Sequence, residues 1–374
     1  MDVFDLDKEY VARTCRRFPI ELAYGNGPLV VDAADKEYID LCAGVGVNSI
    51  GVADSQWTTA VTAQLRRYQH YSDLYYSEPC VKLSEQLCKR TGLKKAFFSN
   101  SGLEANLFAL EAARRYAMEH NRKNEAVILV FNNAYHEGAV SVFQPAGVRF
   151  VFAPVNDLDA VRKIVEETSP VAILFEVISI AQEMVPLSQD FVQGLFALAG
   201  QKDILLVADE TRCGNGRTGA LYSYMHYGVL PDIVTTANGL AGGLPLGVSL
   251  LGDKVQDVFA VGENRFLLGG NPVACAGALD VLARIDDNFM RAIENRSRMI
   301  FDMLRNAPGV RSITGMGLMI GIETKKSPID IVASCRIHGV LVFGTKNKVC
   351  LMPPLNIPEM LLAQAVDIVC QACI

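Results

Sequence analysis

Short apolar runs alternate with helix-like stretches through the middle of the chain, from about residue 94 to residue 252. Alternation of this kind predicts βα units around a mostly parallel sheet. The runs are apolar almost without interruption, which is typical of strands that are buried on both faces. They cover residues 96–99, 126–131, 148–153, 171–177, 203–209, 232–237 and 247–252.

The two ends of the chain have a different pattern. The first 50 residues contain two strand-like segments with a polar turn between them, at residues 29–33 and 37–41. Two long helical patterns follow Pro272, and the rest of the chain mixes helices with strands. We therefore predict an α/β protein with a large domain at residues 51–260 and a smaller α+β domain assembled from residues 1–50 and 261–374. The later patterns are a strand pair at residues 313–323, a hairpin at 341–352, and helices that begin near Pro328 and Pro358.

Composition narrows the class of protein. The 374 residues are 50% hydrophobic and 20% charged, and 35 basic against 41 acidic residues give a net charge of -6. Nucleic-acid-binding domains usually carry a basic patch, so this balance argues against nucleic acid as a partner. The apolar runs are broken well before the roughly 20 residues that a membrane span needs, and the N-terminus does not resemble a secretory signal. We expect a cytoplasmic protein whose ten cysteines stay reduced, without disulfides or a zinc site.

Residues 100–106, Asn-Ser-Gly-Leu-Glu-Ala-Asn, follow a predicted strand and open a predicted helix. Backbone amides at a helix N-terminus bind phosphate groups, and Ser101 and Gly102 allow a close approach. The spacing of Ser101 and Glu104 also fits a capping box, which needs no ligand. Phosphate binding and helix capping without a ligand both remain open as interpretations of this segment.

A carboxylate, Asp209, stands at the C-terminal end of the predicted strand at residues 203–209. Ligands of open α/β sheets bind at this end of the strands, and a buried carboxylate there can pair with a protonated ring nitrogen of a cofactor. Strand ends also carry Asp simply as a turn former. Residues 214–219 match G-x-G-x-x-G, but they run into an aromatic segment instead of a helix, so we interpret them as a loop.

Two further segments either belong to a functional site or only stabilise the fold. Tyr135 and His136 follow a predicted strand, where they either supply an aromatic face and a titratable ring or simply pack. Residues 269–272, Gly-Gly-Asn-Pro, precede a helix and place proline in its first turn, which capping alone explains.

In this order the segments resemble the class III aminotransferases of the ornithine and acetylornithine type, which use pyridoxal phosphate on a fold-type I scaffold. The resemblance covers nearly the whole chain. It implies a mostly parallel central sheet with helices on both faces, and a homodimer. The segments on which the resemblance rests include residues 100–106, 133–136, 209–210, 214–219, 224–233 and 269–272.

The resemblance also implies roles for individual residues. Asp209 would hold the pyridine nitrogen of the cofactor, Tyr135 would stack on the ring with His136 beside it, and Ser101 and Gly102 would bind the phosphate. The other positions that fall at the cofactor in this family are Leu103, Glu176 and Arg212.

The residue that decides the chemistry of this family is a lysine, which bonds the cofactor as a Schiff base and moves the α-proton of the substrate. The corresponding segment reads Thr-Thr-Ala-Asn-Gly-Leu-Ala-Gly-Gly at residues 235–243, so Asn238 stands at the lysine position. An amide has neither a nucleophilic amine nor a pKa suited to general-base catalysis near neutral pH. We therefore expect no ordinary transamination.

The family's substrate and phosphate positions change as well. The arginine that grips the substrate carboxylate falls at Cys350, and the glutamate that neutralises it falls at Ala181. Losing both partners leaves no unpaired buried charge, so the two changes are mutually consistent. Threonines expected at Leu103 and Leu267 and a glutamine expected at Arg212 are also replaced. We expect pyridoxal phosphate or pyridoxamine phosphate to bind noncovalently and weakly, or not at all.

Lys348 is a candidate replacement amine. If residues 348–352 form a strand, Lys348 and Cys350 point to the same face, and the amine could enter the emptied arginine site. Residues 344–348 also have the composition of a turn, and a surface lysine at a hairpin tip is the favoured interpretation.

Three functions follow from these observations. The favoured one is a pseudoenzyme that binds a small anion or the cofactor noncovalently, as a homodimer or as a heterodimer with an active paralogue. The second is an active acetylornithine-type aminotransferase, against which Asn238 argues. The third is an enzyme independent of pyridoxal phosphate, with Arg212, His136, Lys348 and Cys350 as its reactive groups.

Overall fold

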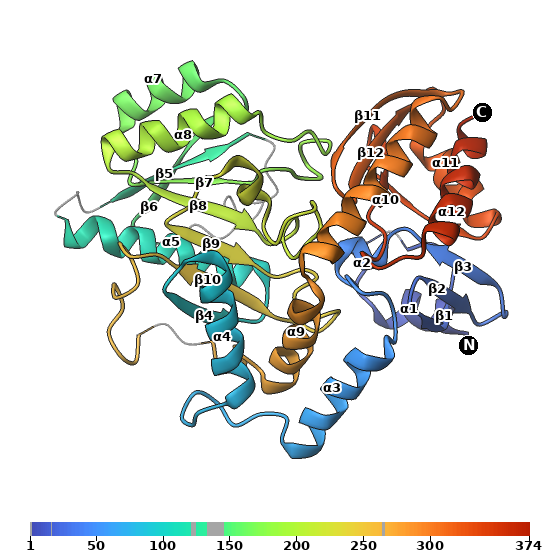
Figure 1. Ribbon diagram of the computed structural model, residues 1–374, viewed down its shortest axis with the longest axis horizontal. Helices are drawn as coiled ribbons and strands as arrows, with labels where there is room; N and C mark the ends of the chain where they lie inside the picture. Colours follow the sequence, from blue (N-terminus) through green and yellow to red (C-terminus); the bar gives the residue numbers. More distant parts are fainter. Residues whose placement is uncertain (1, 16, 121–124, 133–145, 264–265) are drawn as a thin grey trace.

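The computed structural model describes residues 2–15, 17–120, 125–132, 146–263 and 266–374. Figure 1 shows a large sheet surrounded by helices beside a smaller region, in which the blue N-terminal and red C-terminal parts of the chain lie together. Both regions have the secondary structure that the sequence patterns predicted.

The large sheet has seven strands in the order β4-β10-β9-β8-β7-β5-β6. Neighbouring strands are parallel except at β10, which runs antiparallel to β4 and to β9. The prediction of a mostly parallel sheet is confirmed. The strands are β4 (Lys95–Ser99), β5 (Ala126–Phe131), β6 (Val148–Ala153), β7 (Ala172–Phe175), β8 (Leu205–Glu210), β9 (Ile233–Thr236) and β10 (Gly247–Leu251).

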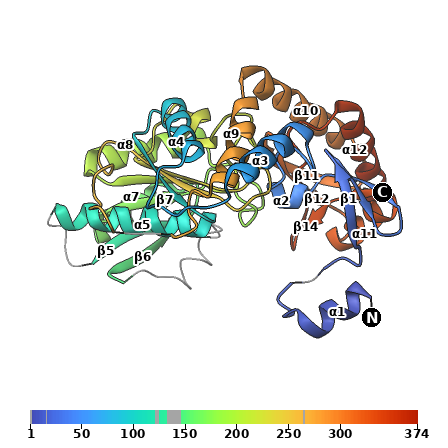
Figure 2. The ribbon, with the colours of Figure 1, turned by 90° about the horizontal axis from the view of Figure 1, so that it is seen from below.

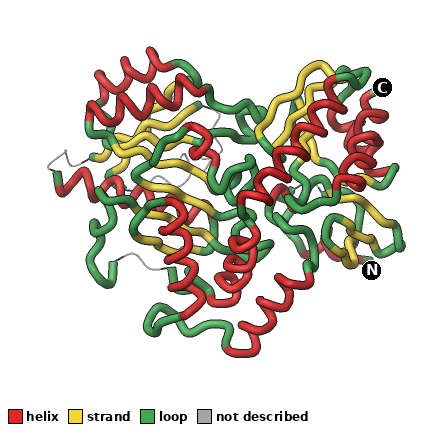
Figure 3. The backbone as a smooth tube through the Cα atoms, in the orientation of Figure 1, coloured by secondary structure: helices red, strands yellow, loops and turns green. Residues whose placement is uncertain are grey.

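Helices cover both faces of this sheet (Figure 3). Along β5, Ile128 and Val130 belong to the core that includes α5, whereas Leu129 and Phe131 belong to the core on the opposite face. This division arises because successive side chains of a strand point to opposite faces, and it explains why the run is apolar throughout. The helices around the sheet are α3 (Ser55–Arg67), α4 (Glu78–Thr91), α5 (Gly102–Glu119), α7 (Leu158–Thr168), α8 (Gln189–Lys202), the short 3-10 helix η1 (Ser223–Tyr227) and α9 (Pro272–Arg284).

Helix α9 lies beyond residue 260 in the sequence, yet it packs against α3 and α4. Its residues Ala274, Cys275 and Ala278 belong to the core of the large sheet. The division of the chain into two domains stays a prediction. Helix α9 links the two parts, because it was assigned to the smaller domain and packs against helices of the larger one.

The smaller region contains two four-stranded sheets, in the orders β1-β2-β3-β13 and β11-β12-β15-β14. Strand β13 from the C-terminal part pairs in parallel with β3 from the N-terminal part, with Val340 opposite Ile39. Both chain ends therefore contribute strands to one sheet of the smaller region. The strands are β1 (Leu22–Asn26), β2 (Leu29–Asp32), β3 (Glu37–Asp40), β11 (Val310–Met316), β12 (Met319–Thr324), β13 (Val340–Leu341), β14 (Phe343–Gly344) and β15 (Lys348–Leu351), and the helices are α2 (Ala43–Gly46), α10 (Asp287–Arg305), α11 (Pro328–Ile337) and α12 (Glu359–Cys373).

The first helix, α1 (Val3–Tyr10), stands apart from the rest of the molecule (Figure 2). It buries none of its side chains. Across the described ranges, every helix is too short or too polar to cross a membrane.

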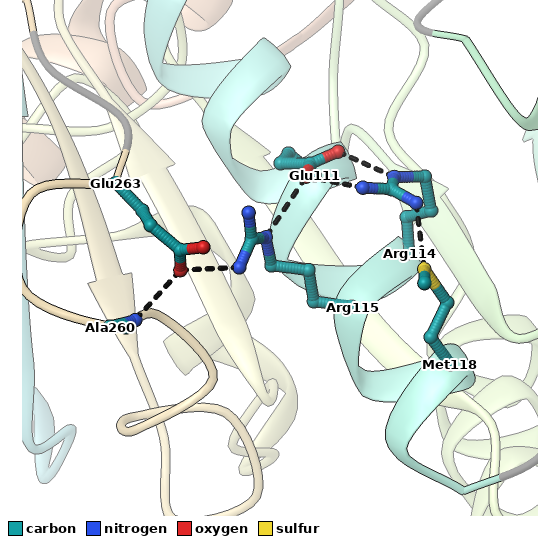
Figure 4. Close-up of polar contacts among 6 residues, drawn as sticks. All are labelled: Glu111, Arg114, Arg115, Met118, Ala260 and Glu263. Atoms are coloured by element: carbon teal, nitrogen blue, oxygen red, sulfur yellow. Dashed lines mark hydrogen bonds and ion pairs between the residues drawn. The ribbon is translucent and has the colours of Figure 1, made fainter.

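A network of ion pairs fixes α5 to the loop after β10 (Figure 4). Arg115 reaches from the helix to Glu263 with a contact of 2.5 Å, and Glu263 also accepts a hydrogen bond from the amide of Ala260 at 2.8 Å. Within the helix, Glu111 pairs with both Arg114 and Arg115, at 2.7 and 3.0 Å. These groups are partly exposed, so the network positions the loop more than it stabilises the fold.

Candidate functional site

The candidate site lies where β8 and β9 end side by side. Asp209 is opposite Thr235 and Glu210 is opposite Thr236 in this parallel pair. Because parallel strands bring their carboxyl ends to one edge, the loops after both strands meet there. Asp209 is buried, with 1% of its surface exposed.

Among the described residues, Asn106 and Thr211 donate hydrogen bonds that orient the carboxylate of Asp209. The backbone amide and the hydroxyl of Thr211 donate to Oδ1 at 3.0 and 2.5 Å, and Nδ2 of Asn106 donates to Oδ2 at 2.8 Å. Asn106 is held in turn, because its Oδ1 accepts from the hydroxyl of Thr235 at 2.6 Å. A chain of buried hydrogen bonds therefore connects α5, β8 and β9 through this carboxylate.

The N-terminus of α5 lies against the same two loops. A Cβ added at Gly102 would lie 2.8 Å from Cβ of Thr211 and 3.4 Å from Cβ of Ala237. Only glycine allows the helix to begin so close to the loops after β8 and β9. The structure thus brings Gly102, Asp209 and the segment that contains Asn238 to one place.

The capping interpretation of Ser101 is confirmed. Its Oγ accepts a hydrogen bond from the amide of Glu104 at 3.2 Å, and Glu104 Oε2 accepts from the amide and the side chain of Asn100 at 2.6 and 2.9 Å. The first-turn amides of Gly102 and Leu103 have no acceptor within an α-helix. Capping therefore does not occupy the groups that an anion would use at this helix end.

Asn238 lies two residues beyond β9, and its backbone is fixed from two directions. Its amide donates to the carbonyl of Thr211 at 2.8 Å, and its carbonyl accepts from Nδ2 of Asn215 at 2.9 Å. The next residue, Gly239, accepts from the hydroxyl of Ser49 at 2.6 Å. The side chain of Asn238 is half-buried beside these bonds. A carboxamide there can donate and accept hydrogen bonds, but it cannot form an imine.

Ser49 also connects this loop to the smaller region, because its carbonyl accepts from the amide of Leu355 at 2.7 Å.

Strand β8 ends with a buried acid, Glu210, and the loop that follows carries the half-buried Arg212. Burial raises the pKa of Glu210 to about 7, although Ser223, Tyr224 and Cys213 all donate hydrogen bonds to it. These donors place the carboxylate at the start of η1, so its role is to fix the loop. Residues 214–219 form turns and a bend instead of opening a helix, which confirms the interpretation of this segment as a loop.

Lys348 is buried in β15, so its interpretation as a surface lysine at a hairpin tip is wrong. It is 4% exposed, and its Nζ donates to the carbonyl of Glu183 at 2.9 Å and to the hydroxyl of Thr314 at 2.8 Å. The long side chain reaches across β12 to the loop after β7, which turn composition could not reveal. Cys350 lies two residues along the same strand, and burial raises the pKa of its thiol to about 12.

The remaining candidates are spread around this edge. Glu176 is buried one residue beyond β7, whereas Ala181 is exposed in the following turn. Leu267 is 64% exposed in the loop before α9. Tyr135 and His136 lie outside the described residues. In the described part of the chain, no cluster of acidic, histidine or cysteine side chains suits a metal ion.

Sequence reasoning missed Asn106, Thr211 and Thr235, which orient Asp209. One signal was present, because Asn106 interrupts an otherwise apolar helix face at residues 105–113. A polar side chain at such a position needs a buried partner, and the carboxylate at the end of β8 is that partner.

The comparisons with known proteins identify the family and the fold of the chain. The family model described as Aminotransferase class-III matches residues 10–373. The chain belongs to the class-III aminotransferases. Among curated members, it is 37% identical to the acetylornithine aminotransferase of Haemophilus ducreyi, over 98% of this chain and 97% of that protein. It is 32% identical to the acetylornithine aminotransferase of Methanocaldococcus jannaschii, over 95% and 94% of the two chains.

Solved class-III aminotransferases have the same fold as this chain. The N-acetylornithine aminotransferase of Stenotrophomonas maltophilia superimposes with a TM-score of 0.87 at 28% identity, over 99% of this chain and 98% of that one. The ornithine δ-aminotransferase of Plasmodium falciparum gives a TM-score of 0.90 at 26% identity, over 99% and 97%. The expected class III fold is therefore confirmed over nearly the whole length.

Proposed function

We propose that this class-III aminotransferase relative binds pyridoxal phosphate or pyridoxamine phosphate noncovalently and does not transaminate. The observation that carries the proposal is Asn238, which follows β9 beside Asp209, where the family resemblance expects the cofactor-linking lysine. The alternative of an active acetylornithine-type enzyme rests on overall identity with the curated relatives.

The residues of the site suit the ring nitrogen and the phosphate of the cofactor, but they do not suit a covalent link to it. The buried carboxylate of Asp209 suits a protonated pyridine nitrogen, and the start of α5 at Gly102 suits a phosphate. Asn238 does not suit a covalent link. In family members the bound cofactor serves as an electron sink, and in this chain Asn106 and Thr211 would keep Asp209 oriented toward its ring nitrogen.

Loss of the substrate clamp supports the same proposal. Cys350 and Ala181 replace the arginine and glutamate that the resemblance expects, and a buried thiol with a raised pKa does not attract a carboxylate. We propose a homodimer in the cytoplasm with a small molecule as its ligand, and pairing with an active paralogue is the alternative assembly.

Borohydride trapping tests the proposal. The purified protein is incubated with pyridoxal phosphate, reduced with borohydride and mapped by mass spectrometry. We expect saturable absorbance changes without a pyridoxyl-lysine, because a noncovalently bound cofactor forms no imine with the protein and borohydride then reduces only its free aldehyde. The variant Asn238→Lys should acquire the adduct at residue 238, and Asn238→Gln serves as the matched control without an amine.

Two results would contradict the proposal. One is a pyridoxyl adduct on a native lysine together with turnover of N-acetylornithine and a 2-oxo acid, which would establish the active enzyme. The other is an absorbance change that persists in Asp209→Ala, because binding would then not use the site described above.

A further inference from the structure

Two adjacent cavities lie in the smaller region, between α11 and the segment that leads into β1. Their volumes are about 330 and 390 Å³. Both are lined by Arg17 and Phe18 from that segment and by Val332 and Arg336 from α11, and we call them together the α11 groove. Sites for small molecules have volumes of about 300–1,000 Å³. Each cavity is therefore large enough for a small ligand.

The smaller cavity has an apolar wall to which both ends of the chain contribute. Ile20 and Leu22 come from the N-terminal part, and Leu341 and Val342 come from the C-terminal part. Phe18 and Leu22 are 50% and 55% exposed at the edge of this hollow. Covering such apolar surface is favourable, so the groove suits an occupant with an apolar body.

The charges of the groove have one sign. Among the described residues, no Asp or Glu lines either cavity, whereas Arg17 and Arg336 line both. Arg336 stacks on the ring of Phe18, with its guanidinium carbon 5.1 Å from the ring centre, and within the described chain it forms no ion pair with a carboxylate. Stacking uses the flat face of a guanidinium and leaves its N–H donors available. The groove therefore offers a carboxylate a charged partner beside an apolar wall.

The second guanidinium of the groove is in contact with α1. Nη1 of Arg17 lies 3.3 Å from Oδ1 of Asp7 and 3.4 Å from Oδ2. Both side chains are partly exposed, and α1 buries none of its side chains. An exposed ion pair of this kind is weak. Asp7 thus places on Arg17 a carboxylate that another carboxylate can replace.

The groove is separate from the site at the ends of β8 and β9. Its described lining residues all fall within residues 17–22, at Cys42 and within residues 328–345. Cys42 begins the segment that ends at Ser49, and the hydroxyl of Ser49 donates to the carbonyl of Gly239 at 2.6 Å. The groove is thus a second place on the molecule, connected to the first through residues 42–49.

We propose that the α11 groove binds a small monocarboxylic acid with an apolar body. The carboxylate pairs with Arg336 and replaces Asp7 at Arg17, while the apolar body lies against Phe18 and Leu22. Binding is noncovalent and involves no chemical step. The inference is independent of the proposed function, because the groove and the cofactor site share no residue.

Isothermal titration calorimetry of the full-length protein tests the proposal, with octanoate as the probe. Octanamide, which has the same chain without the charge, and acetate, which has the charge without the chain, are the matched ligands. We expect saturable binding of octanoate. Both matched ligands should bind at least about tenfold more weakly, because each lacks one of the two features that the groove recognises.

Variants of the full-length protein locate the binding. Arg336→Gln should weaken octanoate binding at least about tenfold, whereas Arg305→Gln, at an exposed arginine of α10 that does not line the groove, should leave it unchanged. Leu22→Glu puts a negative charge at the edge of the groove and should weaken binding more than the neutral Leu22→Gln. Asp7→Asn should tighten binding by about twofold to fivefold, since it frees Arg17 from a competing carboxylate.

Three results would overturn the proposal. Octanoate fails to bind saturably at up to about 10 mM, octanamide binds as tightly as octanoate, or Arg336→Gln and Arg305→Gln bind octanoate equally well. The comparison of the three ligands uses the unaltered protein, so it decides the matter even where a variant fails to fold.

Discussion

Replacing Asn106 by alanine should break the hydrogen-bond chain that orients Asp209. Asn106 is 7% exposed and lies between two fully buried partners. Its amide donates to Asp209 at 2.8 Å, and its carbonyl accepts from the hydroxyl of Thr235 at 2.6 Å. The substitution therefore removes one donor from a carboxylate and the acceptor of a buried hydroxyl.

The expected loss follows from these two bonds. A hydrogen bond to a charged group contributes about 1.5–3 kcal/mol, and a buried hydroxyl that loses its partner costs about 1–3 kcal/mol. Thr211 continues to donate to Asp209, so the carboxylate keeps part of its support. We expect the free energy of unfolding to fall by about 3 kcal/mol, a large share of the roughly 5–15 kcal/mol of a typical domain.

Equilibrium urea unfolding measures this loss, and a double-mutant cycle locates it. Thr235→Val alone removes the hydroxyl and should lower the free energy of unfolding by about 1 kcal/mol. Added to Asn106→Ala, it should lower it little further, because valine removes the hydroxyl that the first change left without an acceptor. A loss below about 1 kcal/mol for Asn106→Ala, or strict additivity of the two changes, would refute the reasoning.

Three further predictions concern other positions. Gly102→Val should lower the free energy of unfolding by about 2 kcal/mol, because its Cβ would lie 2.8 Å from Cβ of Thr211. As a control in the same urea assay, Gly200→Ala should raise the free energy of unfolding by up to about 1 kcal/mol, because the space around this helix position is open. Burial raises the pKa of Glu210 to about 7, so the free energy of unfolding should fall by about 3 kcal/mol as the pH rises from about 4.5 through 7, relative to Glu210→Gln. Equal pH slopes of the melting temperature for the two proteins would contradict this prediction. Lys348→Met should lower the free energy of unfolding by about 1–2 kcal/mol through loss of its bonds to two partly buried oxygens. Lys346→Met, on the exposed turn, should change it by less than about 0.5 kcal/mol.

The elements of the large sheet were predictable because their signal is local. Strand β5 reads as an unbroken apolar run, and each of its side chains is buried on one face or the other. Asp209 was predictable for a similar reason, since a carboxylate directly after such a run marks the end of a strand. The unbroken apolar run predicted the strand, and the single carboxylate after such a run predicted where the strand ends.

Contacts between distant segments were not predictable in the same way. Lys348 was expected at the surface because its neighbours have turn composition, but its amine bonds to Glu183, which lies 165 residues away in the sequence. The packing of α9 against α4 likewise joins segments that are far apart in the sequence, and the sequence interpretation treated all cysteines as scattered. It also passed over the C-x-x-C spacing of Cys370 and Cys373. Register between helices is a tertiary property that one sequence does not reveal.

Pairing of β13 with β3 has a consequence for how the protein is made. Ile39 leaves the ribosome roughly 300 residues before its neighbour Val340. At about 5–20 residues per second, the N-terminal strands would wait about 15–60 seconds for the strand that completes their sheet. The large sheet, encoded between them, has time to form first. A nascent chain arrested before residue 340 should therefore expose β3 to proteases while β5 to β9 are already protected.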